Sequence, residues 1–113
     1  MNEEDIRRRI ETERALAERN RREFMRWIIL LAANINRPTH STLRFLLSVV
    51  EGEYHDVTEL QLRRELDYLA SRDLVKVFTD LIGQVSVELT RYGIDIAEYT
   101  VAVEPGIARP PKV

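Results

Sequence analysis

Three polar side chains near the middle of the chain have the chemistry needed to recognise a nucleic acid. They are Gln61, Arg63 and Arg64, in a segment over residues 58–71 whose leucines recur at helical spacing. Arginine can donate two hydrogen bonds to guanine, glutamine can pair with adenine, and both can hold phosphate oxygens. Asp67 shares their exposed side, so a solvated face on which arginines pair with acids is the alternative.

Three further residues are candidates for binding phosphate. Thr42 and Arg44 lie at the start of a helix predicted over residues 42–51, and Lys76 lies in a predicted strand. Free N–H groups at the start of a helix favour an anion, and basic side chains pair with phosphate. The same atoms around Thr42 also suit an ordinary helix cap, and both uses stay open.

The sequence gives no support for enzymatic or metal chemistry. It contains no cysteine, which excludes disulfides, thiolate chemistry and cysteine-based zinc sites. His40 and His55 lack the spacing of metal ligands, and there is no glycine-rich phosphate loop. We therefore expect no enzyme, no metal site and no cofactor.

The overall charge supplies no field that would draw the chain to DNA. The net charge is −2 and the isoelectric point about 5.7, so DNA binding would need a local basic patch. The longest apolar run, residues 27–33, is too short to span a membrane, and the first residues do not resemble a signal peptide. We expect a cytoplasmic protein without a membrane partner.

The periodicity of the chain predicts a mainly α-helical fold with a small β-hairpin. The expected helices cover residues 3–34, 42–51, 58–71 and 91–99, and the strands lie on either side of a turn at residues 80–83. Ser41 or Thr39 is the expected cap of the second helix, and Thr58 with Gln61 has the form of a capping box. The buried leucines of the third helix are expected to be Leu62, Leu66 and Leu69, and those of the last helix Ile94 and Ala97.

The N-terminal segment carries an apolar stripe that favours self-association. Residues 1–26 hold eight arginines and seven acids, which predicts a solvated helix with i,i+4 pairs rather than a phosphate-binding arginine cluster. At about 100° per residue, the stripe falls in one narrow sector and consists of Ile6, Ile10, Ala17, Phe24, Ile28, Leu31 and Ile35. Glu13 and Asn20 interrupt it, so a break near Asn20 stays open. We expect Ile6, Ile10, Ala17 and Phe24 to pair two copies into a homodimer.

Two short motifs are typical of a winged helix-turn-helix. LDYLASRDLV at residues 66–75 resembles the passage from the third helix into the wing, and LTRYG at residues 89–93 resembles the exit from the second wing strand. Over residues 24–110 the chain resembles the small winged-helix proteins of Mu-like phages and prophages, described as ArsR-like. The resemblance implies a winged helix-turn-helix with a DNA-associated or regulatory role. The turn at residues 80–83 departs from a DNA-binding wing because it has no basic residue.

The expected organisation is a charged N-terminal helix over residues 1–23, a winged-helix domain over residues 24–103 and an extended tail over residues 104–113. The first functional hypothesis is a phage-type transcriptional regulator that binds double-stranded DNA as a dimer. The alternative is a module of the same shape that binds a phage or host protein instead, through the stripe and the apolar tip Leu81-Ile82. That tip could also enter a DNA groove or fold back on the core.

Overall fold

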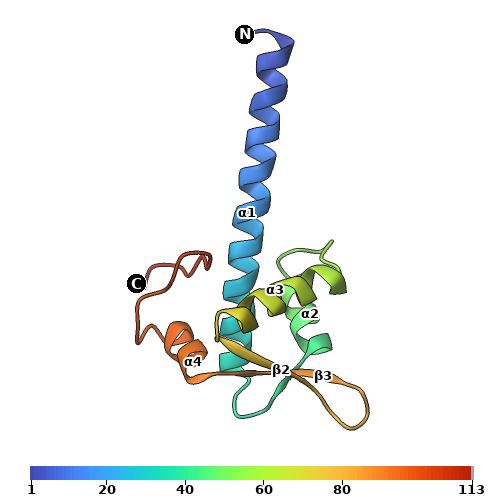
Figure 1. Ribbon diagram of the computed structural model, residues 1–113, viewed down its shortest axis with the longest axis vertical. Helices are drawn as coiled ribbons and strands as arrows, with labels where there is room; N and C mark the ends of the chain where they lie inside the picture. Colours follow the sequence, from blue (N-terminus) through green and yellow to red (C-terminus); the bar gives the residue numbers. More distant parts are fainter. Residues whose placement is uncertain (113) are drawn as a thin grey trace.

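The computed structural model describes residues 1–112, which form a long helix joined to a compact domain (Figure 1). In chain order the elements are α1 (Glu3–Ile35), β1 (Ser41–Thr42), α2 (Leu43–Glu51), α3 (Glu59–Ser71), β2 (Val75–Thr79), β3 (Val85–Leu89) and α4 (Arg91–Ala97). Two helices followed by a β-hairpin and a further helix make a winged helix-turn-helix, so the predicted fold class is confirmed. Residues 3–20, here named the arm, project from the domain and give the molecule its longest extent of 57 Å.

Helix α1 is continuous, so the break considered near Asn20 does not occur. The helix begins after Asn2, whose side chain accepts a hydrogen bond from the N–H of Asp5 at 2.9 Å. Its second half enters the core through Met25, Trp27, Ile29, Leu30, Ala32 and Ala33. The apolar stripe lies on the other side of the helix, where Leu31 and Ile35 stay 37% and 74% exposed. Within the stripe, Phe24 and Ile28 are half-buried and pack against the core, so the predicted dimer contact at Phe24 is partly used in folding.

Side-chain caps fix the starts of both helices of the helix-turn-helix. Thr42 caps α2, so the expectation that Ser41 or Thr39 would do so is wrong; Ser41 is instead buried in β1. Thr58 and Gln61 form the predicted capping box at α3, which satisfies two backbone N–H groups. The leucines expected to face the core from α3 are all buried, namely Leu62, Leu66 and Leu69.

The sheet has three strands in the order β1-β3-β2, one more than the predicted hairpin. Ser41 and Thr42 pair antiparallel with Val87 and Ser86 of β3. A strand of two residues is too short to show a period of two, so the hairpin prediction omitted it. This extra strand places the start of α2 directly against the wing.

The turn of the wing lies where the sequence placed it. The N–H of Gly83 donates to the carbonyl of Asp80 at 3.0 Å, and Gly83 has a φ of 83°, which glycine adopts without steric cost. Leu81 and Ile82 at the tip are 105% and 86% exposed. The expectation that they might fold back on the core is therefore wrong.

Helix α4 ends at Ala97, two residues earlier than predicted, because Tyr99 takes up a left-handed conformation with a φ of 62°. Its fully buried isoleucine is Ile96, whereas Ile94, expected to be buried, is only half-buried.

The C-terminal segment returns to pack against α1. Ile107 is buried in the core, and the N–H of Ala108 donates to the carbonyl of Glu23 at 3.1 Å. Arg109 donates to the carbonyls of Ile96 and Val101 at 3.0 and 2.9 Å. Within residues 1–112, no helix is both long enough and apolar enough to cross a membrane.

Candidate nucleic-acid interface

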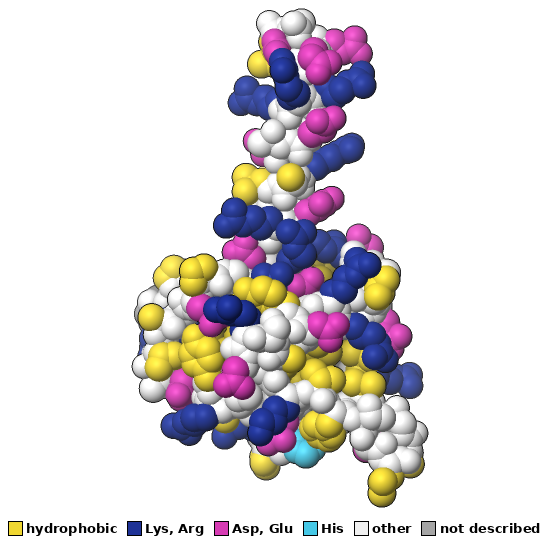
Figure 2. Space-filling model, in the orientation of Figure 1, with side chains coloured by type: hydrophobic (Ala, Val, Ile, Leu, Met, Phe, Trp, Pro, Cys, Tyr) yellow, Lys and Arg dark blue, Asp and Glu magenta, His cyan; other side chains and the backbone are white. Residues whose placement is uncertain are grey.

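Helix α3 directs its two predicted arginines toward different neighbours. Arg63 lines a groove with Arg44 of α2, here named the wing-side groove. Arg64 lines a second groove with Arg21 and Arg22 of α1, here named the arm-side groove. The two separate because consecutive helical residues point about 100° apart. Figure 2 shows basic side chains gathered where the arm meets the domain and along the adjoining edge.

The wing-side groove combines two arginines with the start of a helix. It is lined by Leu43, Arg44, Leu47, Glu59, Arg63, Gly83, Gln84 and Val85. Arg63 approaches Glu59 at 3.9 Å, but their side chains are 48% and 60% exposed, so water weakens this pair. Arg44 forms no ion pair with any of residues 1–112. Helix α2 also has no acid in its first turn, where the helix dipole favours a negative charge. The groove therefore suits an anion.

Arg21 ties α1 to the turn between α2 and α3. Its guanidinium donates to the Asp56 carboxylate at 2.9 Å and to the side-chain oxygen of Gln61 at 3.4 Å, and it lies over the Tyr54 ring at 4.6 Å. The hydrogen bond from Arg21 lowers the pKa of the Asp56 carboxyl. Burial raises the pKa of the Tyr54 hydroxyl. Arg21 is thus already engaged within the protein.

Arg22 and Arg64 face the arm-side groove without comparable partners. In the described part of the chain, neither forms an ion pair. The acids that line the groove are Glu18 and Glu65. Glu65 is already bound to Arg26 at 2.8 Å, which leaves Glu18 as the acid able to compete. Both guanidiniums are consequently available to an external anion.

Two other predicted contacts are partly used in helix capping. The side-chain oxygen of Gln61 accepts a hydrogen bond from the N–H of Thr58 at 3.2 Å, in addition to the one from Arg21. Because glutamine uses both its oxygen and its amino group to pair with adenine, only the amino group is left. The Thr42 hydroxyl accepts from the N–H of Phe45 at 3.0 Å and keeps one proton to donate. Both side chains therefore retain donors, which suit phosphate.

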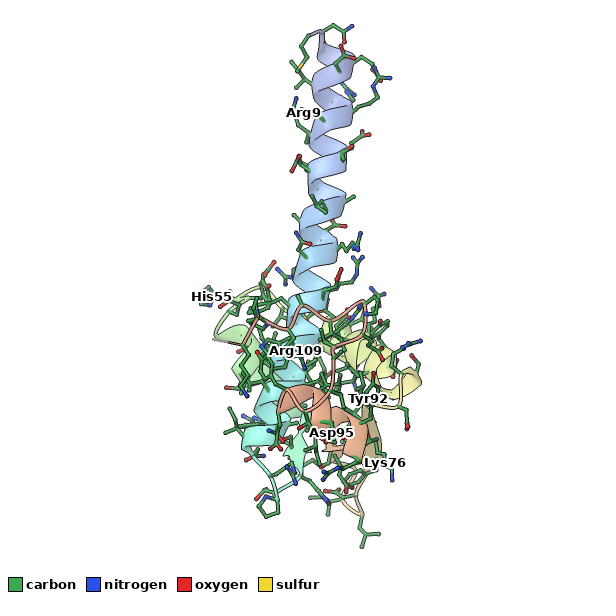
Figure 3. All side chains as sticks on the ribbon, turned by 90° about the vertical axis from the view of Figure 1, so that its left-hand side faces the viewer. Arg9, His55, Lys76, Tyr92, Asp95 and Arg109 are labelled. Atoms are coloured by element: carbon green, nitrogen blue, oxygen red, sulfur yellow. The ribbon has the colours of Figure 1, made fainter. Side chains whose placement is uncertain are left out.

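Lys76 and Asp67 lie outside both grooves, unlike the arginines of the predicted set. Lys76 is exposed on β2 directly opposite Glu88 of β3 and lines neither groove. Figure 3 shows it near the end of the domain remote from the arm. Asp67 is exposed on α3, and neither Arg63 nor Arg64 forms an ion pair with it. The alternative, in which these arginines pair with acids on a solvated face, therefore holds for Arg63 with Glu59 but not for Asp67.

One buried ion pair beneath the interface was not predicted from the sequence. Arg26 binds Glu65 at 2.8 Å, with side chains only 12% and 7% exposed. The same guanidinium lies 3.6 Å from the Tyr68 ring centroid and donates to the carbonyl of Gly106 at 2.9 Å. In the sequence, the acid Glu65 on the leucine side of α3 indicates a buried charge. Its partner could not be identified, because Arg26 lies far away along the chain. The pair holds α1, α3 and the C-terminal segment together and so positions both grooves.

Comparisons with known proteins bear on the fold. No protein-family model matches the sequence, and no curated protein has a significantly similar sequence. A solved structure, a mutant of MepR from a multidrug-resistant S. aureus clinical isolate, is similar with a TM-score of 0.60 and 14% sequence identity. The alignment covers 92% of this chain and 77% of that chain. This chain has a winged-helix fold.

Proposed function

We propose that this protein is a winged-helix transcriptional regulator of phage or prophage type that binds double-stranded DNA. One observation carries the proposal: Arg64 in the first half of α3, and Arg44 and Arg22 in the grooves beside it, have no ion-pair partner among residues 1–112. Unpaired arginines on both sides of a helix match the two phosphate strands that border a groove of DNA. The net charge of −2 therefore conceals a local basic surface (Figure 2).

In this arrangement, α3 enters the major groove, which is about 12 Å wide and admits one helix. Arg63 and Arg44 contact one phosphate strand from the wing-side groove, and Arg64 approaches the other. The wing adds little charge, because residues 77–90 contain no lysine or arginine. With Arg63 and Arg64 on the phosphate strands, the free amino group of Gln61 is left for base readout by α3.

We further propose that the protein acts as a homodimer through the apolar stripe of α1. The arm exposes Ile6 and Ile10 by 45% and 48%, and Ile35 continues the same line on the domain. A solvated helix whose apolar residues recur at intervals of three, four and seven matches the seam by which helices pair. Two copies would present two α3 helices, as DNA half-sites require.

The proposal is tested by fluorescence anisotropy with a labelled duplex of about 30 base pairs, long enough for two half-sites. The wild type should bind at low salt, and Arg44→Ala and Arg64→Ala should each reduce the slope of log affinity against log salt by about one. The matched control is Arg9→Ala, because Arg9 is an exposed arginine without an ion pair on the distal arm. Absence of binding, or equal loss in all three variants, would refute DNA recognition by α3.

The exposed wing tip favours a second candidate function, a module that binds a phage or host protein. Leu81 and Ile82 are almost fully exposed, and residues 77–90 around them contain no lysine or arginine. This candidate predicts that the wild type fails to bind any duplex at low salt. It also predicts that a captured partner is lost on Leu81→Ser and retained on Val101→Ser, a change at another exposed apolar residue.

A further inference from the structure

We propose that Arg22 of α1 and Arg64 of α3 together bind one phosphate of the DNA backbone, so that the long helix is itself part of the DNA-binding surface. The inference rests on the proposed function and extends it beyond the helix-turn-helix. Both side chains line the arm-side groove, although they come from helices that are far apart in sequence.

Among the arginines where α1 enters the domain, Arg22 alone has no acidic partner within residues 1–112. Arg19 binds Glu23 at 2.9 Å, Arg21 binds Asp56 at 2.9 Å and Arg26 binds Glu65 at 2.8 Å. All four residues are arginines, so they differ in the direction of their side chains. Arg22 lines the groove and does not pair with an acid of the described chain. Its exposed guanidinium is therefore free to meet a ligand.

Glu18 is the one acid that could occupy Arg22 from within the groove. It lies one helical turn away, but no ion pair between the two is formed. Such an i,i+4 pair on a solvated helix is weak. A phosphate is a stronger competitor, because it accepts charge-assisted hydrogen bonds from both guanidiniums whereas Glu18 would pair with Arg22 alone.

The two helices that carry this site are fixed on each side of it. Arg26 and Glu65 join α1 to α3 through a buried ion pair, and Arg21 joins α1 to the turn before α3 through Asp56. Two cations in one groove repel each other when no anion is present, and the surrounding pairs prevent the helices from moving apart. The groove is therefore preorganised for an anion, and its position beside the start of α3 selects the phosphodiester strand.

The test measures duplex affinity across a salt series for Arg22→Ala, Arg64→Ala and the double variant. Losing one phosphate contact lowers affinity by about five- to tenfold near 0.1 M salt, since each contact contributes a slope of about 0.9. If the two arginines share one phosphate, the double variant should reduce the slope by about one in total. A total reduction of about two would show separate phosphates and would overturn the shared site. Arg22 is exposed, and circular dichroism verifies that each variant folds.

Controls separate this inference from the proposed function. Arg14→Ala, on the same helix but two turns further along the arm, should leave affinity unchanged. Glu18→Gln should strengthen binding in the wild type but not in the Arg22→Ala background. Wild-type binding that Arg22→Ala does not alter overturns the inference alone, whereas absence of wild-type binding overturns the proposed function as well. Inorganic phosphate at constant ionic strength should not compete; competition that depends on Arg22 would show a free-anion site instead.

Discussion

The arm and the start of α3 contain similar mixtures of arginine and acid, but they use them differently. On the arm, Arg7 pairs with Glu3 and Arg8 with Asp5, within one helix and in full contact with water. Beside α3, Arg64 has no such partner in the described chain. The balance of charge in a segment therefore does not decide whether its arginines are free; the direction of each side chain does.

The acids of the domain explain the difference. Glu65, Asp56 and Glu104 each hold an arginine that joins two separate segments of the chain. Acids committed to such structural pairs are unavailable to the arginines that face outward. The arm is an isolated helix without such a demand, and the ion pairs it forms, Glu3 with Arg7 and Asp5 with Arg8, join residues one turn apart.

The largest effect expected from this comparison is on stability. Glu65→Ala should lower the free energy of unfolding by about 3–5 kcal/mol, because it leaves the buried Arg26 without its partner. Arg8→Ala on the arm removes an exposed pair and should cost at most about 0.5 kcal/mol. Urea unfolding measures both. Equal losses of unfolding free energy in the two variants would mean that the ion pairs of the arm and of the domain contribute equally to stability.

Self-association should distinguish two exposed residues of the arm. Ile10 lies in the stripe and Leu16 lies outside it, yet they are 48% and 47% exposed. Ile10→Asp should weaken the dimer by about tenfold or more, since each buried isoleucine contributes about 1.5–3 kcal/mol. Leu16→Asp should leave it unchanged. Analytical ultracentrifugation measures the dissociation constants, and a monomeric wild type or equal effects of both variants would remove the stripe as the dimer contact.

Much of the fold could be predicted because its signals are local. The capping box of Thr58 and Gln61 spans three residues, and the leucines of α3 repeat within one helix. Strand β1 was missed because its pairing joins Ser41 to Val87, and two residues show no pattern. The candidate site could be predicted only in part for the same reason. The residues of α3 are identified from one short segment of sequence, whereas their neighbours on α1 and the wing are far away along the chain.

A smaller effect is expected at Asp67, an exposed acid of α3 about one helical turn from Arg63 and Arg64. Asp67→Asn should raise duplex affinity by about two- to fivefold, because an exposed charge of this kind contributes at most about 1 kcal/mol. Glu11→Gln removes the same charge from the arm and should change nothing. The anisotropy assay used for the arginine variants compares the two. An equal gain from both would show that only net charge matters.

The smallest effect concerns Arg21, where the arm meets the domain. Its hydrogen bond lowers the pKa of Asp56 below the usual value, so the ionised carboxylate is favoured in the folded state. A lowered pKa contributes stability above the unfolded value, about pH 4, and this contribution disappears as the pH falls through the folded value. Asp56→Asn should therefore unfold slightly more easily than the wild type at neutral pH, and equally once the pH lies well below the folded value. Because Asp56 is exposed, the shift should be small, and thermal unfolding followed across this range measures it. A difference that grows as the pH falls would contradict the pairing and would leave Arg21, like Arg22, free to bind DNA.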